Sequence, residues 1–186
     1  MSQLYIRQKV FSWKDRFSVK DADGIDRYTA EGELWSLGKK LHVNNMAGEE
    51  VAYIQQKVWS FKPRFFVFIS GIQTAEVVRE ITLLRPKYTI HGLDWDCRGD
   101  ITGHDYEIWH GGDMIVRIHK VWFTWGDSYE LDIPDSRNEI LALSVVLAID
   151  AVISQARAAS ASSGGGSSSS PPGNTSPPAP RRAFTI

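Results

Sequence analysis

The chain has 186 residues, of which 42% are hydrophobic and 23% are charged, and its formal net charge is −1. This composition is typical of a globular domain with one sizeable core, and it excludes a globally basic nucleic-acid-binding protein, so no nucleic-acid partner is expected. The single cysteine, Cys97, excludes an internal disulfide framework and fits a reducing compartment. Charged residues interrupt the apolar positions after Met1, so we expect no signal peptide and a cytoplasmic protein.

Short strands are predicted along most of the chain. Apolar and polar residues alternate in them, and segments rich in Gly, Asp and Asn separate one strand from the next. Such a series predicts a mainly β sandwich or barrel rather than strands that alternate with helices. The predicted strands cover residues 4–11, 16–20, 26–33, 39–43, 51–59, 65–69, 75–83, 87–91, 94–98, 105–109, 114–124 and 129–133.

An internal repeat runs through this β region. Residues 8–17 match residues 56–65 at seven of ten positions, and a weaker third copy begins at His119. The spacings favour a pair of hairpins repeated about three times. Within the copies, Phe17 and Phe65 are predicted to face the core, while the lysines and arginines beside them face the opposite side.

A helix is predicted to follow the last strand, over about residues 137–157. Residues 140–149 are apolar except for Ser144, so no side of this helix suits water. Ser136 and Glu139 have the spacing of a capping box at its start. Ten apolar residues span about 15 Å, whereas a bilayer core needs about 30 Å. We therefore expect a closed antiparallel barrel that encloses this helix.

The C-terminal residues 158–186 differ from the rest in composition. Ser, Gly and Pro dominate them, and they offer almost no apolar surface for burial. A segment of this kind is expected to be a disordered, flexible appendage. The alternative is a tether whose Arg181, Arg182 and Phe184 contact a protein partner or an anionic membrane.

An ordered series of motifs resembles the LURP-one-related family. The motifs are Gln-Lys-Val-Phe-Ser-Trp at 8–13, Gly-Glu-Leu-Trp-Ser-Leu-Gly-Lys-Lys-Leu at 32–41, the run 92–108 containing Asp-Ile-Thr-Gly-His-Asp-Tyr-Glu-Ile, Asp-Ile-Pro-Asp at 132–135 and the apolar run 145–153. That family is similar to the tubby C-terminal domain and to phospholipid scramblases. The resemblance covers residues 1–157, and it implies a barrel of twelve strands around a C-terminal helix. It implies little chemistry.

Motifs for catalysis, cofactors or metals are sparse, so we expect a non-enzymatic protein without a cofactor. A thiol–imidazole pair of Cys97 with His91 or His104 is conceivable, but a lone cysteine in a strand is usually a small core residue. The five histidines lack zinc-ligand spacing. Residues 94–105 resemble a calcium loop, yet Arg98 stands where a ligand oxygen is needed, and acidic turns explain the same residues.

The candidate binding site is a basic surface formed by the first third of the chain. Residues 1–64 contain 11 Lys or Arg against 8 Asp or Glu, whereas residues 65–135 contain 6 against 12. Two Lys-x-Arg pairs are predicted to project from one side of a strand each, and tubby-type domains bind phosphoinositides through such a pair. Pro63 suggests a sheet edge or bulge there. Solvated strand faces are often basic without a ligand. The candidate residues are Lys14, Arg16, Lys39, Lys40, Lys62 and Arg64.

Three functions remain open. The first is a module, peripheral at a membrane, that binds an anionic phospholipid headgroup or another phosphorylated ligand through this basic surface. The second is scramblase-like lipid translocation, which requires an exposed apolar surface. The third is a protein-interaction scaffold, for which Trp35, Trp59, Trp122 and Trp125 would be partly exposed.

Overall fold

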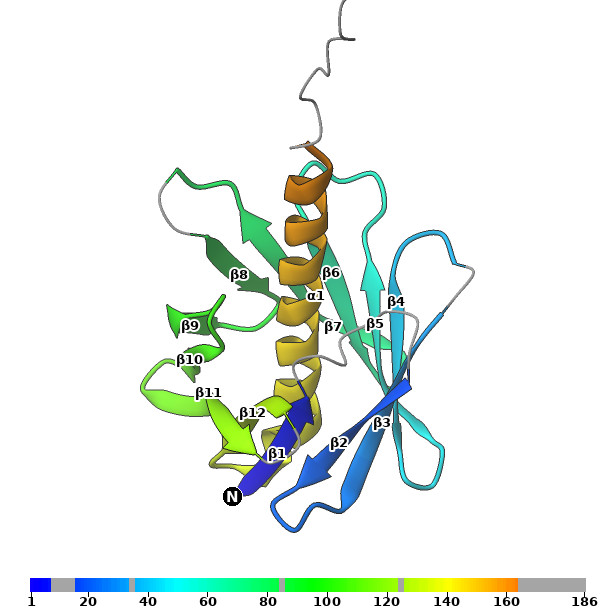
Figure 1. Ribbon diagram of the computed structural model, residues 1–186, viewed down its shortest axis with the longest axis vertical. Coiled ribbons are helices and arrows are strands. Elements are labelled where there is room, and N and C mark those ends of the chain that lie inside the picture. The colour runs from blue at the N-terminus through cyan, green and yellow to red at the C-terminus, as the bar shows by residue number, and fades with distance from the viewer. Residues whose placement is uncertain (8–15, 34–35, 84–85, 124–125, 164–186) are drawn as a thin grey trace, which may run out of the picture.

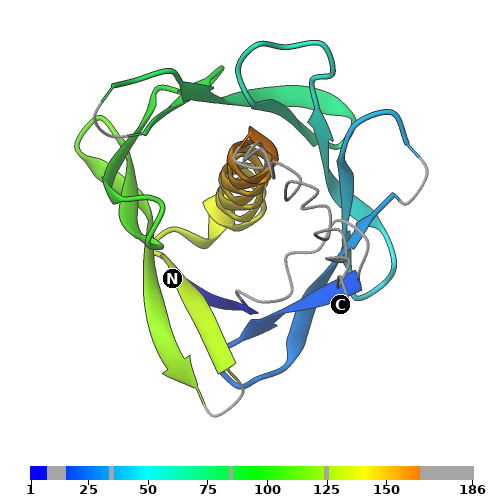
Figure 2. The ribbon, with the colours of Figure 1, turned by 45° about the horizontal axis from the view of Figure 1, so that its top comes forward.

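The computed structural model of the protein describes residues 1–7, 16–33, 36–83, 86–123 and 126–163. These residues form a closed antiparallel barrel around one helix, as the sequence predicts (Figures 1 and 2). The strands are β1 (Ser2–Arg7), β2 (Arg16–Asp21), β3 (Asp26–Gly32), β4 (Lys40–Asn45), β5 (Glu50–Gln56), β6 (Arg64–Ile69), β7 (Ile72–Glu80), β8 (Lys87–His91), β9 (Trp95–Asp100), β10 (Asp105–His110), β11 (Asp113–Phe123) and β12 (Gly126–Ile133).

Each strand pairs with its neighbour in the sequence, and β1 pairs with β12 to close the wall. The closing register runs from Ser2 opposite Ile133 to Arg7 opposite Ser128. Alternate residues point inward because side chains in a strand face opposite sides of the sheet. In β2, for example, Phe17 and Val19 are buried while Arg16 is exposed. Closure removes the unpaired strand edges that an open sheet would expose.

The barrel interior is filled by α1 (Glu139–Ser163), which follows a short 3₁₀ turn, η2 (Ser136–Asn138). Every residue from Ala142 to Ile153 is buried. This helix is long and apolar enough to cross a membrane, but 78% of its apolar stretch is buried inside the barrel. Each fully buried Leu, Ile or Val contributes about 1.5–3 kcal/mol, so the wall and the helix depend on each other for a core.

The predicted capping box at the start of the helix is wrong. Asp135, not Ser136, accepts a hydrogen bond from the Arg137 backbone N–H. The Glu139 carboxylate instead accepts hydrogen bonds from the hydroxyls of Ser2 and Tyr28. The barrel wall brings these strand hydroxyls to the buried carboxylate, and local sequence rules do not contain that tertiary contact.

The two ends of the barrel carry connections of different length. At the end where α1 terminates, residues 33–39, 57–63 and 81–86 connect β3 to β4, β5 to β6 and β7 to β8. At the opposite end, residues 22–25, 46–49 and 70–71 form short turns. We call the first the loop end, defined by residues 36–40, 57–64, 79–83 and 86–87, and the second the turn end, defined by residues 21–26, 45–50 and 70–72.

The repeat does not correspond to three equivalent hairpin pairs. Its first copy falls mostly on residues 8–15, outside the described part of the chain. The second copy forms the connection between β5 and β6, four strands after the first, and the third covers the connection between β11 and β12, six strands further. The unequal spacing means that the weak third copy is not a third unit of the same kind.

Candidate functional site

The three connections of the loop end form one continuous surface. The Gln56 backbone N–H donates to the Lys39 carbonyl at 2.8 Å, which joins the β5–β6 connection to the β3–β4 connection. The Arg79 N–H donates to the Pro63 carbonyl at 3.0 Å, which joins it to the start of the β7–β8 connection. Four of the six predicted binding residues therefore share this surface, namely Lys39, Lys40, Lys62 and Arg64.

The charges of the two ends have opposite signs. The loop end contains seven cations, Lys39, Lys40, Lys57, Lys62, Arg64, Arg79 and Lys87, and one anion, Glu80. The turn end contains five anions, Asp21, Asp23, Asp26, Glu49 and Glu50, and no Lys or Arg. The net charge of the chain, −1, does not show this separation of positive and negative charge. The separation becomes visible only when the strand order places the segments at the two ends.

Carboxylates hold three of the predicted cations in place. Lys40 pairs with Glu33 at 3.0 Å, Lys62 with Glu80 at 2.5 Å and Arg64 with Glu76 at 2.9 Å. The hydrogen bond from Lys62 lowers the pKa of Glu80, and hydrogen bonds from His42 and Lys40 lower the pKa of Glu33. These pairs orient the cations, and a phosphate would share or displace the carboxylate partners.

Lys39 is the fourth predicted cation at the loop end. Its side chain is half-buried, and burial lowers the pKa of its ammonium group. A lysine in such a setting gains most from an added anion, since the anion would offset the loss of hydration.

The other two predicted residues are Lys14 and Arg16. Lys14 lies outside the described residues. Arg16 is exposed at the start of β2, where it stands opposite Glu31 of β3. Four strand spacings separate β2 from β6, which is about 19 Å along the wall. The Arg16 guanidinium and the Lys62–Arg64 pair are thus separate parts of the surface.

Pro63 behaves as its chemistry requires. It lies in the connection immediately before β6, where its missing N–H breaks no ladder hydrogen bond, and its carbonyl accepts from Arg79. Lys62 therefore projects from the connection, and only Arg64 projects from the strand.

Sequence reasoning missed a set of apolar side chains at the loop end. Trp59, predicted to end a strand, is 96% exposed in the β5–β6 connection, and Phe61 beside it is fully exposed. The exposure of Trp59 is what a protein-interaction scaffold would require, while the side chains of Trp35, Trp122 and Trp125 are outside the described part. Leu37, Ile81 and Leu83 are also exposed. Alternation of Trp59 and Phe61 between two lysines was the available signal.

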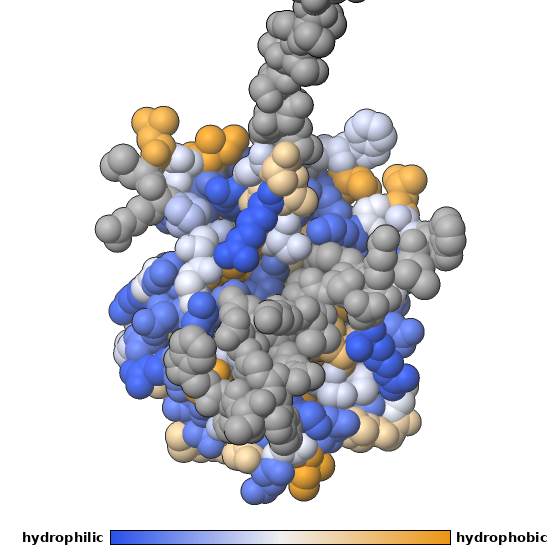
Figure 3. Space-filling view, viewed as in Figure 1, coloured by the Kyte–Doolittle hydropathy of each residue, from blue (hydrophilic) through white to orange (hydrophobic). Residues whose placement is uncertain are grey.

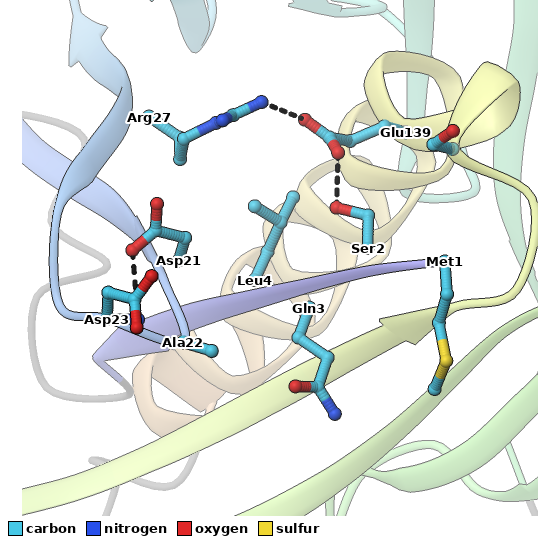
Figure 4. A pocket seen from close by; sticks show the side chains of 10 residues that line it. Met1, Ser2, Gln3, Leu4, Asp21, Ala22, Asp23, Arg27 and Glu139 are labelled. Atoms are coloured by element: carbon cyan, nitrogen blue, oxygen red, sulfur yellow. Dashed lines mark hydrogen bonds and ion pairs between the residues drawn. The ribbon is translucent and has the colours of Figure 1, made fainter.

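A second candidate lies near the turn end, where the start of α1 meets β1 (Figure 4). This hollow has a volume of about 500 Å³ and is lined by Met1, Ser2, Gln3, Leu4, Asp21, Ala22, Asp23, Arg27, Ser136 and Glu139. The Arg27 guanidinium lies 3.6 Å from the Glu139 carboxylate, which also accepts from Ser2. Glu139 is occupied in anchoring the helix, so the hollow offers less to an anion than the loop end.

The residues considered for catalysis or metal binding have structural surroundings. Burial and, to a lesser extent, the charge of the nearby Asp96 raise the pKa of the Cys97 thiol to about 12, which disfavours the nucleophilic thiolate. The calcium-like string folds as the β9–β10 hairpin, where the Asp100 carboxylate accepts from Thr102 and Gly103. Within the described ranges, no three His, Cys, Asp or Glu side chains gather as metal ligands.

Comparisons with known proteins agree with this fold. The model of the LURP-one-related family matches residues 2–150. An uncharacterized Bacillus subtilis protein, YxjI, is 32% identical over 153 residues, which cover 82% of this chain and 94% of that protein. An Arabidopsis thaliana protein solved by X-ray crystallography superimposes with a TM-score of 0.56 at 15% identity, covering 80% of this chain and 90% of that one. The likeness to the Arabidopsis thaliana protein concerns the fold alone.

Proposed function

Since the chain belongs to the LURP-one-related family and folds as a closed barrel with a basic loop end, we propose that it is a non-enzymatic binding module. Its ligand is an anionic group that carries phosphate, either a phospholipid headgroup at a membrane or a free phosphorylated molecule. The site consists of Lys39, Lys40, Lys62 and Arg64 at the loop end, with Arg16 further along the wall.

One observation carries this proposal: the segments that define the loop end hold seven cations and one anion, while the segments that define the turn end hold five anions. Arginine can bind phosphate oxygens in bidentate fashion, and lysine binds them as a point charge. Each lysine or arginine near an anionic lipid surface contributes about 1 kcal/mol to binding, so several together give measurable, salt-sensitive association. The acidic turn end is repelled by the same surface, which would fix the orientation.

Two other functions receive less support from the geometry. Lipid translocation by the apolar helix would need α1 at the surface, whereas its residues from Ala142 to Ile153 are buried. Binding to a protein partner through aromatic side chains of the barrel is compatible with the exposure of Trp59, while binding through the tail concerns residues outside the described part of the chain. A protein partner is therefore an outcome to be recognised in the test.

Flotation with lipid vesicles tests the proposal. We expect the whole chain to float with vesicles of phosphatidylcholine and phosphatidylserine at low salt, to release at high salt, and to ignore phosphatidylcholine alone. Excess inositol hexakisphosphate should compete if the shared phosphate chemistry is what binds. Binding only to the free phosphorylated molecule would identify the soluble source of the ligand.

A matched pair of variants locates the binding site. Lys87→Glu places a negative charge at the loop end, and Arg137→Glu makes the same change in charge in η2, at the opposite end of the barrel, at an exposed arginine. Lys87→Glu should weaken vesicle binding several-fold, and Arg137→Glu should leave it nearly unchanged. Equal effects of the two variants, on binding to vesicles or to inositol hexakisphosphate, would exclude the loop end as the site.

A further inference from the structure

Apolar side chains project from all three connections of the loop end. Trp59 and Phe61 project from the β5–β6 connection, Ile81 and Leu83 from the β7–β8 connection, and Leu37 from the β3–β4 connection. Phe61 and Leu83 are fully exposed. Figure 3 shows hydrophobic groups projecting at the top of the molecule on both sides of the helix end, above a wall that is mostly hydrophilic.

Backbone contacts fix the base of the β5–β6 connection, which carries Trp59 and Phe61, so the tip of this connection projects from the barrel. The Lys57 N–H donates to the Arg64 carbonyl at 3.0 Å across the base. Gly38 of the neighbouring connection packs so closely that an added Cβ would lie 3.2 Å from Val58. Next to Val58, Trp59 adopts a φ of 63°, a left-handed conformation that a bulky residue rarely adopts. Backbone strain at an exposed aromatic residue points to a function at that position.

Cations flank these apolar tips. Lys57 and Lys62 lie on either side of Trp59 and Phe61, and Lys39 follows Leu37 by two residues. Lys87 lies at the end of the β7–β8 connection that carries Leu83. Aromatic residues and lysines in this arrangement suit the interface of a bilayer, where the rings lie among the headgroups and the ammonium groups reach the phosphates.

We propose that the loop end docks on an anionic lipid bilayer by inserting Trp59, Phe61 and Leu83 into the interface, with Leu37 and Ile81 at its margin. This inference rests on the proposed function and adds the mode of binding. A bilayer fits these tips because they project from separate connections with lysines between them, and fluid lipid can surround each projection. A folded protein partner would need a matching recess for each tip.

The turn end provides an internal contrast. Ile25, Met46 and Ile72 are exposed there, but the charged residues of the turn-end segments are all acidic and none of the three exposed residues is aromatic. Anionic lipid would repel that end and attract the loop end. The protein would therefore stand with α1 pointing toward the membrane, its last turn, near Ser163, on the lipid side.

Paired truncations separate insertion from charge attraction. Phe61→Ala with Leu83→Ala removes two fully exposed side chains, so the fold should keep its melting temperature while partition into phosphatidylcholine–phosphatidylserine vesicles falls at least tenfold. The control, Met46→Ala with Ile72→Ala, removes two exposed apolar side chains at the turn end and should leave partition unchanged.

A fluorescent probe reports the depth of insertion. A nitrobenzoxadiazole label on Phe61→Cys, in a Cys97→Ser background, should shift to shorter wavelength on vesicle binding and be quenched by nitroxide-labelled lipid. The same label on Ile72→Cys should remain in water. Salt-sensitive binding with an unshifted Phe61 probe and no effect of the truncations would refute insertion and leave the proposed function intact. Absence of binding to anionic vesicles would refute insertion, and absence of binding to inositol hexakisphosphate as well would also refute the proposed function.

Discussion

The Asp150 carboxylate and the His104 imidazole lie 46 residues apart in the sequence and meet inside the barrel, with 2.9 Å between Oδ1 and Nε2. The Tyr129 hydroxyl donates to the other carboxylate oxygen, and the His104 and Tyr129 rings stack at 4.6 Å. Asp150 is the only acidic residue of the buried helix segment 142–153. Through His104 and Tyr129 it connects α1 to the connection after β9 and to β12.

Replacement of Asp150 should strongly destabilise the protein. Asp150→Ala leaves the buried His104 and Tyr129 without this partner, which costs about 3–5 kcal/mol, whereas Asp150→Asn keeps a hydrogen-bonding side chain and should cost less. Urea unfolding measures the difference. Asp94→Ala, which removes an exposed carboxylate, is the control and should change the free energy of unfolding by less than about 0.5 kcal/mol. Similar losses for Ala at both positions would contradict the role of Asp150.

Gly99 should not tolerate a side chain. Its φ is 115°, and an added Cβ would lie 2.7 Å from the Asp105 carbonyl oxygen and 2.9 Å from the Tyr106 Cα, both on the paired strand β10. Gly99→Ala therefore combines backbone strain with displacement of β10 and should cost about 2–4 kcal/mol. Gly48→Ala is the matched control, because φ is 82° but no atom lies within 4 Å of the added Cβ. Thermal unfolding of the two variants would show whether the close approach matters beyond φ.

His42 should make stability depend on pH. Burial would lower the pKa of its imidazole, but hydrogen bonds to Glu50 and Glu33 outweigh burial and raise it. The charged His42 therefore stabilises the fold at pH values below about 6.5, and this stabilisation is lost as pH rises through the raised pKa of the folded state. Melting curves of the wild type and of His42→Gln should differ most at acidic pH and converge at alkaline pH. A constant difference across this range would rule out the titration of His42.

The Cys97 thiol should react slowly in the folded protein. Burial raises its pKa to about 12, so little thiolate forms at mildly alkaline pH. Reaction with a chromogenic disulfide should be much slower than for Phe61→Cys in a Cys97→Ser background, and urea should abolish the difference. Equal rates in native conditions would show that the thiol is accessible and ionised.

The barrel was predictable because its sequence rules are local and strong. Alternation of apolar and polar residues defines strands such as β2 and β6, and an all-apolar helix needs a closed wall around it. The end of β5 was misplaced because Trp59 continues an apolar pattern that does not distinguish a core residue from a residue at a loop tip. Glu139 was misassigned because its partners, Ser2 and Tyr28, come from distant strands.

The candidate site was predictable only in its chemistry. Excess cations in the first third of the sequence indicated a basic surface, but Arg16 and Arg64 were grouped although three strands lie between theirs. In an antiparallel barrel, connections after odd-numbered strands all lie at one end. Grouping the connections that follow odd-numbered strands places Lys39, Lys62 and Lys87 at one end with the exposed Trp59. The pattern of each strand by itself does not show this grouping.

The innermost segment of the molecule is synthesised after every strand of the wall. The wall closes only when Ser2 meets Ile133, and its lining has nothing to enclose until the residues after Glu139 leave the ribosome. Contacts between such distant parts of the chain slow folding and leave the nascent strands without their core in the meantime. Translation that stops before α1 should thus yield a product that aggregates and is sensitive to proteases. The barrel can be completed only after α1 has been synthesised.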